Sequence, residues 1–112
     1  MKNEQWIKEF PVSITVCNTE GVILEMNESA SRVFQKDGGS ALVGQSVLNC
    51  HPEPARSRLK QMLEKPETNS YTIEKNGQKK LIYQCPWFEN GVFQGMVELS
   101  LPIPDTMPHF VR

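Results

Sequence analysis

The stretch ITVCNTEGVILEMNESASRVF, residues 14–34, contains the signals of three successive elements. Its first part alternates apolar and polar side chains, which is the pattern of a half-buried β-strand. The NTEG segment favours a tight turn, because Gly21 adopts a positive φ angle without steric cost. VILEM is the returning strand, and Asn27 is suited to cap a helix whose apolar stripe ends at Phe34. The stretch therefore predicts a hairpin followed by a short helix.

The middle of the chain combines an interrupted apolar run with a proline-marked helix. In LVGQSVLNCHPEP, residues 42–54, Gly44 interrupts the apolar run, so short helical turns are expected rather than one long element. Pro52 suits the first turn of a helix, where its missing N–H costs nothing, and Glu53 lies near the positive end of the helix dipole. An amphipathic helix is therefore predicted over residues 52–64, with His51 at its entrance.

Three alternating segments follow, separated by short turns. Residues 70–75, 79–88 and 92–101 each alternate apolar and polar side chains, and the NGQ and ENG segments between them favour hairpins. Local hairpins give antiparallel strands, and the preceding helices must cover one apolar sheet face. The sequence predicts an α+β fold. Its expected parts are an amphipathic lead-in, a folded domain and a proline-rich tail, at residues 1–11, 12–101 and 102–112.

Composition limits the classes of function. The chain has 112 residues, enough for one hydrophobic core. Its net charge is −1, from 12 basic and 13 acidic side chains without a basic stripe, so no nucleic-acid surface is expected. Cys17, Cys50 and Cys85 are widely spaced, which argues against a disulfide framework and against a metal site. The N-terminus lacks a signal peptide and no membrane segment is present, so a cytoplasmic protein is expected.

Taken together, these segments resemble a PAS domain. Residues 14–34 are similar to the family's opening hairpin and first helix, and residues 42–54 to its segment of Gly and His-Pro-acid before the long helix. NGVFQGMVELSL, residues 90–101, is similar to the closing strand. The resemblance covers roughly residues 12–101. It implies a five-stranded antiparallel sheet in the order 2-1-5-4-3, with short helices and one longer helix on one face enclosing a small cavity.

Alternation along the strands and the helix stripe select the side chains expected to line that cavity. These pocket candidates are Ile14, Val16, Phe34, Val47, Leu59, Leu63, Tyr71, Tyr83, Val97 and Leu99. The opposite sheet face is expected to meet a second copy, because the short apolar lead-in helix must dock on something. The expected homodimer interface comprises Trp6, Ile7, Phe10, Ile23, Ile82 and Met96. Glu25, Glu74 and Glu98 are expected to face solvent or a partner.

The adjacent Cys50 and His51 invite three sharper interpretations. A light-sensing branch of the family pairs Cys with a flavin, but the Arg-Phe-Leu-Gln run that follows there is missing here, so flavin is not expected. His51 is a weak candidate for a haem ligand. A nucleophile–base pair is disfavoured, because adjacent residues in an extended segment point apart. The expected alternative is a buried thiol and a surface imidazole that is dispensable for folding.

The expected function follows from the resemblance. It implies a stand-alone sensory and protein-interaction module that binds a small ligand in its cavity, signals by contact with an unidentified partner protein and has no catalytic activity. A small-ligand or haem-binding carrier is the alternative, followed by a small enzyme on a cupped sheet. Prolines at 102, 104 and 108 block the helix that often leads to an output domain in the family.

Overall fold

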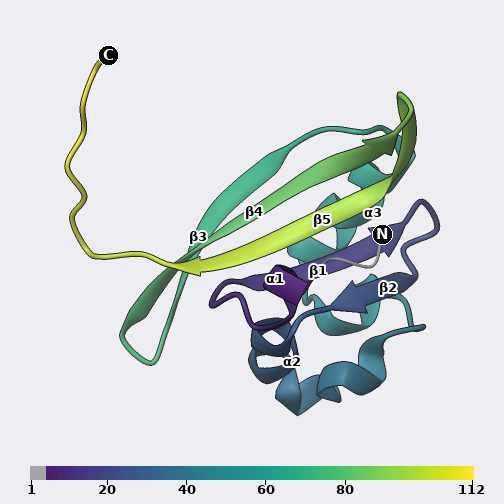
Figure 1. Ribbon diagram of the computed structural model, residues 1–112, viewed down its shortest axis with the longest axis horizontal. Helices are drawn as coiled ribbons and strands as arrows, with labels where there is room; N and C mark the ends of the chain where they lie inside the picture. Colours follow the sequence, from purple (N-terminus) through teal and green to yellow (C-terminus); the bar gives the residue numbers. More distant parts are fainter. Residues whose placement is uncertain (1–4) are drawn as a thin grey trace.

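The structure, a computed structural model, describes residues 5–112 and contains one antiparallel sheet flanked by helices (Figure 1). The five strands follow the order β2-β1-β5-β4-β3, which confirms the expected topology. The strands are β1 Ser13–Asn18, β2 Ile23–Met26, β3 Asn69–Lys75, β4 Gln78–Glu89 and β5 Val92–Pro102. The α-helices are α1 Gln5–Lys8, α2 Glu28–Val33 and α3 Ala55–Glu64, and the 3₁₀ turns are η1 Gln35–Asp37, η2 Gly39–Leu42 and η3 Val47–Cys50. Residues 1–4 of the expected lead-in lie outside the described residues.

The hairpin turns form where the sequence predicts them. Asn76 and Asn90 have φ angles of 53° and 52°, and the glycine after each also has a positive φ, as a two-residue hairpin turn requires. In the first hairpin the side-chain oxygen of Asn18 accepts the backbone N–H groups of Glu20 at 3.0 Å and Val22 at 2.9 Å. Local turn chemistry therefore fixes which strands become neighbours.

Asn27 joins the N-terminal segment, β1 and α2. Its Oδ1 accepts the backbone N–H of Ala30 at 3.0 Å, which caps α2 as predicted, and that of Ile14 at 3.0 Å. Its Nδ2 donates to the carbonyl oxygens of Val12 at 2.8 Å and Ile7 at 3.0 Å. One buried amide thereby holds α1 beside the start of α2.

Helix α3 begins later than the sequence predicts. It starts at Ala55 rather than at Pro52, because a residue that precedes proline avoids the helical region, and Glu53 precedes Pro54. The Glu53 carboxylate still serves the helix start, since it accepts the backbone N–H of Ser57 at 3.1 Å. His51 lies at the end of η3 in an extended conformation, so its expected place at the entrance of the long helix is wrong.

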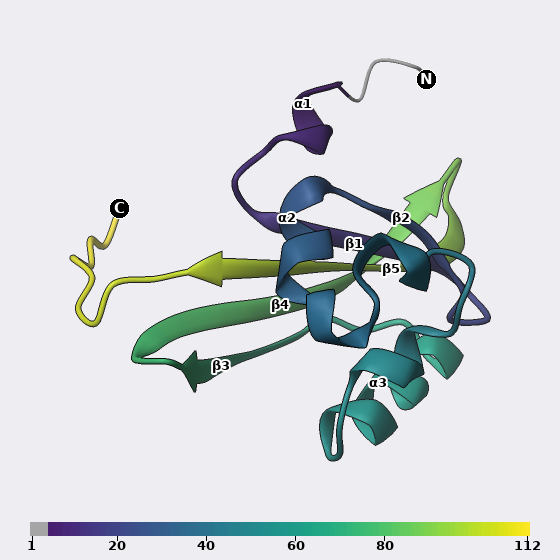
Figure 2. The same cartoon turned by 90° about the horizontal axis from the view of Figure 1, so that it is seen from below.

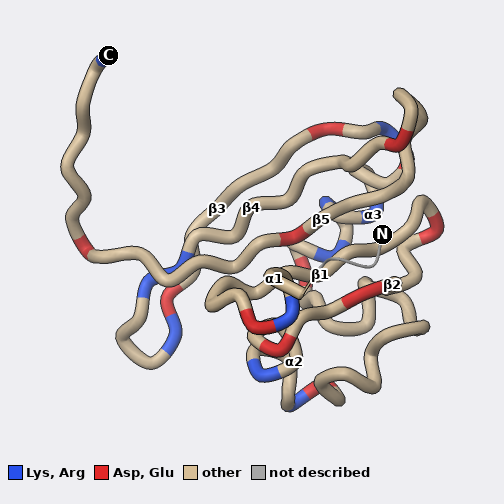
Figure 3. Tube along the Cα trace, viewed as in Figure 1, with Lys and Arg blue, Asp and Glu red and all other residues tan. Residues whose placement is uncertain are grey.

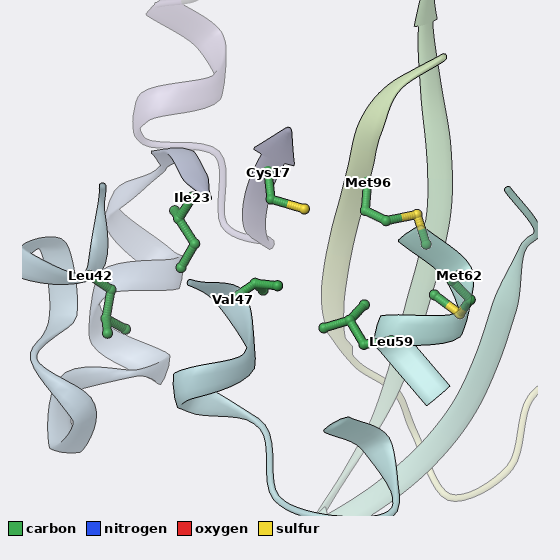
Figure 4. Close-up of a cluster of buried hydrophobic side chains, with 7 residues drawn as sticks. All are labelled: Cys17, Ile23, Leu42, Val47, Leu59, Met62 and Met96. Carbon is green, nitrogen blue, oxygen red and sulfur yellow. The ribbon is translucent and has the colours of Figure 1, made fainter. Parts of the chain in front are cut away.

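The hydrophobic core lies between the sheet and the helical layer (Figure 4). Side chains from β1, β2 and β5 meet side chains from η2, η3 and α3 there. The core residues are Cys17, Ile23, Leu42, Val47, Leu59, Met62 and Met96. Burial of this apolar surface is the main driving force for docking the helices on the sheet.

The helices cover the sheet face opposite to the one predicted. On β1 the buried positions are Ser13, Thr15 and Cys17, while Ile14 and Val16 are only half-buried. On β5 the inward residues include Met96 and Glu98, and Val97 and Leu99 face outward. The same alternation corrects two further sets of residues. Tyr83 is outward and exposed, whereas Ile23, Ile82 and Met96, expected at the dimer interface, are buried inside.

The outward sheet face has little cover. Figures 1 and 2 place α3 on one side of the sheet and α1 on the other. The residues of this outer face come from β1, β4 and β5 and form continuous cross-strand rows: Ile14, Leu99 and Tyr83 in one, and Val16, Val97 and Cys85 in the next. Among the described residues 5–112, the side chains of these rows are half-buried or exposed, so the outer face is apolar and only partly covered.

Basic and acidic residues alternate along the trace of residues 5–112, without a long run of one sign (Figure 3). After Ile103 the chain leaves the sheet as an irregular tail, and Phe110 and Val111 in it are exposed (Figure 1).

Within residues 5–112, no helix has both the length and the apolar character needed to cross a membrane.

Candidate functional site

A pocket of about 450 Å³ opens between the helical layer and the inner face of β3, β4 and β5. Its volume is in the range that holds small molecules. Apolar and aromatic side chains form most of its walls, and His51, Tyr71, Glu98 and Ser100 supply polar groups. Lys75, Lys80, Asp37 and Glu53 also line it. Its apolar wall residues include Val33, Phe34, Ala55, Ile73 and Ile82.

His51 is buried at this pocket rather than directed to solvent, which corrects the expectation of a surface imidazole. Only 9% of the residue is exposed. Its Nδ1 lies 2.9 Å from the carbonyl oxygen of Val47, and its Nε2 lies 2.8 Å from Oε1 of Glu98. Both ring nitrogens thus face acceptors, and a doubly protonated imidazolium satisfies both contacts.

The surroundings of His51 favour its charged form. Burial by itself lowers the pKa of the imidazole, because it penalises the ion. The contact with Cys50, the hydrogen bond to Glu98 and its negative charge, and the Val47 carbonyl outweigh burial and raise the pKa of His51 to about 11. His51 and Glu98 therefore form a buried ion pair at neutral pH.

Glu98 belongs to a polar row that crosses the inner sheet face, so the expectation that it faces solvent or a partner is wrong. The register sets Thr15, Glu98, Gln84 and Asn69 side by side on four strands. Gln84 Nε2 donates to Glu98 Oε1 at 2.7 Å, and Asn69 Nδ2 donates to Gln84 Oε1 at 3.1 Å. The carboxylate thus receives a second donor besides His51, which compensates the cost of its burial.

Cys50 is placed beside His51 but is not arranged as a nucleophile with its base. The Cys50 Sγ lies 3.5 Å from His51 Nδ1, and it donates to the Val47 carbonyl at 3.3 Å. Because Nδ1 of His51 also directs its proton to Val47, this nitrogen has no lone pair available to accept the thiol proton. The geometry gives the two side chains a shared structural partner, the Val47 carbonyl.

The same geometry bears on haem. An iron ligand needs a ring nitrogen without a proton, and in some haem proteins a histidine supplies it. Both nitrogens of His51 are engaged, so ligation through Nε2 would break the contact with Glu98 and leave a buried carboxylate without its cation. The residues present do not fit a haem held by His51. Within residues 5–112, no cluster of three or more His, Cys, Asp or Glu side chains is arranged to hold a metal ion.

The predicted pocket residues divide into three groups. Phe34 and Tyr71 line the pocket. Val47, Leu59 and Leu63 lie in or against the hydrophobic core instead. The remaining five are on the outer sheet face: Ile14, Val16, Tyr83, Val97 and Leu99. Apolar alternation selected the wrong face because the covered face carries the polar row.

Sequence reasoning missed Glu98, Ser100, Ile73 and Ile82 as pocket residues. A signal was present, since the inward positions of β1, β4 and β5 repeat polar residues at corresponding places. A carboxylate in the middle of the central strand, next to Thr15 and Gln84, requires a partner from the covering layer. His51 is the residue of that layer that meets it.

Comparisons with known proteins show the fold. No protein-family model matches the chain, and no curated protein matches it. Among solved structures, the PAS domain of an HTR-like protein from Haloarcula marismortui is similar at 15% identity, covering 88% of this chain and 86% of that one, with a TM-score of 0.63. The chain has the PAS fold, which confirms the resemblance seen in its sequence.

The descriptions of two further similar structures name a ligand or a cofactor. The Aer2 receptor from Vibrio cholerae, a dual PAS-heme oxygen sensor, is 17% identical over 83% of this chain and 95% of that chain, with a TM-score of 0.61. VqmA bound to DPO is 12% identical over 88% of this chain, with a TM-score of 0.67. The present chain spans 54% of that VqmA chain.

Proposed function

We propose that this protein is a sensory module that binds a small molecule between its sheet and helices and signals by protein contact, without catalytic activity of its own. The observation that carries the proposal is the pocket of about 450 Å³, closed on one side by a buried ion pair. Pockets with apolar walls and a few convergent polar groups are the usual form of a small-molecule site.

The position of His51 supports a sensory role over simple storage. It contacts the pocket, the Val47 carbonyl of η3 and Glu98 on the central strand. A ligand that shifts the ion pair would therefore act on the helical layer and on the sheet together. The Aer2 and VqmA structures, which share the fold, are described with haem and with DPO, and they support ligand binding by analogy.

Native mass spectrometry tests ligand binding. The purified protein is incubated with a small-molecule extract of its expression host, and bound masses are measured. We expect an added mass in the wild type and its loss in Ile73→Trp, because Ile73 lines the pocket and its enlarged side chain would fill it. Val92→Trp, at an exposed position of β5, is the matched control and should retain the added mass. Equal spectra for the two variants would contradict binding in this pocket.

For output, we propose that a second copy covers the outer sheet face. The rows that include Ile14, Leu99 and Tyr83 form a broad apolar surface on the side of the sheet opposite α3. Trp6 in α1 and Phe10 just after this helix pack edge to face, with 5.6 Å between their ring centroids, and 62% of Trp6 is exposed. Burying both apolar surfaces in one symmetric interface would remove them from water.

Sedimentation measures this association. The full chain should be a dimer at tens of micromolar, and a truncated chain beginning at Pro11 should dissociate more readily. Tyr83→Asp, on the outer face, should give a monomer, because a charge would be buried in the interface. Lys60→Asp, exposed on α3, is the control and should remain dimeric. A monomeric full chain contradicts the dimer, and a dimer insensitive to Tyr83→Asp places the interface elsewhere.

A further inference from the structure

The floor of the pocket carries hydrogen-bonding capacity that the protein itself does not use. Glu98 and Ser100 are two residues apart on β5, so their side chains lie on the same sheet face, and both line the pocket. They are 8% and 5% exposed. Polar atoms that are open to a pocket and have no protein partner are available to a ligand. Among residues 5–112, the one fully buried side-chain oxygen without a hydrogen bond is Thr15 Oγ1, and Thr15 does not line this pocket.

At the pocket floor, one oxygen of Glu98 and the hydroxyl of Ser100 remain free to form hydrogen bonds. Oε1 of Glu98 accepts both His51 Nε2 at 2.8 Å and Gln84 Nε2 at 2.7 Å. Among the contacts of residues 5–112, no hydrogen bond reaches Oε2 of Glu98 or the hydroxyl of Ser100. A carboxylate oxygen only accepts, whereas a hydroxyl both donates and accepts. A ligand that matches the floor therefore carries a hydrogen-bond donor for Glu98 and a second polar atom near Ser100.

The walls indicate the body of the ligand. Phe34, Ile73 and Ile82 present apolar surface, and the ring of Tyr71 stands on the neighbouring strand. Burial and the charge of Glu98 raise the pKa of the Tyr71 hydroxyl, so this group stays neutral and keeps its proton. Such walls favour an aromatic or aliphatic body over a highly polar one.

The charge balance indicates a neutral ligand. The negative charge of Glu98 is compensated by the imidazolium of His51, with 2.8 Å between the two groups. A charged ligand at the floor would disturb this balance, since a buried charge without a partner is costly. The lysine and acidic side chains that line the pocket are of both signs, two of each apart from the ion pair: Lys75, Lys80, Asp37 and Glu53.

We propose that the pocket binds a small uncharged molecule with an aromatic or aliphatic body and one N–H or O–H group, which donates to Oε2 of Glu98 and lies against the hydroxyl of Ser100. This ligand class rests on the proposed function, because it specifies what the same pocket recognises. The proposal also assigns roles to two residues. Glu98 accepts a hydrogen bond from the N–H or O–H group of the ligand, and Ser100 favours molecules that offer a second polar contact.

Matched pairs of probes test the ligand class by titration calorimetry with the full chain. Indole and 1-methylindole differ by one N–H donor, and phenol and anisole differ by one O–H donor. We expect each donor probe to bind at least about tenfold more tightly than its methylated partner, because the methylated molecule has no proton to donate to Oε2 of Glu98. Benzoate and benzylammonium carry charges and should bind more weakly than phenol.

Two serine variants connect the binding to the floor. Ser100→Ala should weaken the binding of phenol several-fold, because the phenol oxygen can accept from the Ser100 hydroxyl while it donates to Glu98, and indole, which offers no second polar contact, should be affected less. Ser70→Ala, at an exposed position of β3, should leave the binding of both probes unchanged. Ser100→Ala removes a hydroxyl without a protein partner, so folding should be preserved, and its melting temperature checks this. Glu98→Gln removes the negative charge at the same size and should reduce the preference for donor probes.

Each outcome decides between this inference and the broader function. Equal binding of donor and methylated probes, tighter binding of a charged probe, or no binding of any donor probe overturns the ligand class. The mass-spectrometric comparison of Ile73→Trp with Val92→Trp is independent of these probes. If it shows a bound molecule while the donor probes fail, ligand binding stands and the ligand class is wrong. If it shows none, the proposed function itself fails.

Discussion

The imidazole Nε2 of His51 lies 2.8 Å from Oε1 of Glu98, although 47 residues separate the two in the chain. His51 comes from the end of η3, and Glu98 from the middle of the central strand β5. The contact therefore joins the helical layer to the sheet at the floor of the pocket. Because both groups are buried, its effect on stability depends on keeping both partners.

The first prediction concerns the loss of one partner. His51→Ala leaves the Glu98 carboxylate buried without its cation, and it also removes the donor to the Val47 carbonyl. We expect the free energy of unfolding to fall by about 3–5 kcal/mol, the usual effect of breaking a buried ion pair from one side. Urea denaturation followed by circular dichroism measures it. The sequence had suggested that His51 is dispensable.

His109→Ala is the matched control, since that histidine is exposed in the C-terminal tail. Its free energy of unfolding should equal that of the wild type. A His51→Ala variant as stable as His109→Ala would show that the ion pair does not hold the two layers together.

The second prediction is a loss of stability with rising pH. The pKa of His51 is about 11 in the folded protein and about 6.5 in an unfolded chain, so the folded state holds a proton more tightly. The resulting stabilisation is fully present below pH about 6.5 and is lost as the pH rises toward 11. The greatest slope is about 1.4 kcal/mol per pH unit.

The useful window is pH 6.5 to 8. At higher pH the buried thiol of Cys17 and the hydroxyl of Tyr71, whose pKa values are raised, also contribute a loss of stability. Urea unfolding of the wild type should show a falling free energy across this window. His51→Gln cannot titrate there, so its curve should be flat by comparison. Parallel curves for the two proteins would mean that His51 does not hold its proton more tightly in the folded state.

The strand order could be predicted from the sequence because it depends on local signals. Asn18 organises the first turn, Asn27 caps α2, and Asn76 and Asn90 take the positive φ angles of their hairpins. Each of these acts within a few residues of itself. The turns make β1 a neighbour of β2, and β4 a neighbour of both β3 and β5. The pairing of β1 with β5 is not local, and it was predicted from the resemblance to the PAS family.

The covered face could not be predicted from apolar alternation, because the two faces differ little in apolar content. Val16 and Val97 lie on the outer face, while Thr15 and Glu98 lie on the covered one. Alternation reports which positions share a face, and it does so correctly here. It does not report which face is covered when the buried polar groups find partners in another layer.

The candidate site depends on such a long-range partnership. Considered alone, His51 was expected at the surface and Glu98 toward solvent or a partner, since a single ionisable side chain is most often exposed. Considered as a pair they stabilise each other's burial, but their contact spans 47 residues and no local pattern predicts it. Only Phe34 and Tyr71 of the expected pocket residues line the pocket.

The third prediction concerns the core. Leu59 is 2% exposed and packs in the cluster between α3 and the sheet, as the helical stripe in the sequence predicted. Leu59→Asp would place an unpaired charge there, which costs several kcal/mol, and we expect it to unfold the domain. Lys60→Asp introduces the same side chain at the adjacent exposed position and should change the melting temperature little. Similar melting temperatures for both variants would contradict the observed packing of α3.

The fourth prediction concerns the close approach of β5 to β1 at Gly95. This residue has a φ angle of 148°, and an added Cβ would overlap the Cys17 carbonyl oxygen and lie 2.8 Å from Asn18 Cα. The same carbonyl accepts the indole N–H of Trp87 at 3.1 Å. Gly95→Ala must therefore push β1 away from β5 and disturb this hydrogen bond. We expect a loss of several kcal/mol in the free energy of unfolding, or no folding.

Gly77→Ala is the control that separates the steric overlap at Gly95 from the cost of a positive φ angle in alanine. Gly77 has a φ angle of 77°, but an added Cβ meets nothing within 4 Å, so only the cost of a left-handed alanine remains, about 1–2 kcal/mol. Urea denaturation of both variants, followed by far-ultraviolet circular dichroism, measures the difference. A larger loss in Gly95→Ala assigns the excess to the contact with β1. Equal losses would mean that the two strands separate at this point without cost, and that Gly95 is required only for its backbone angle.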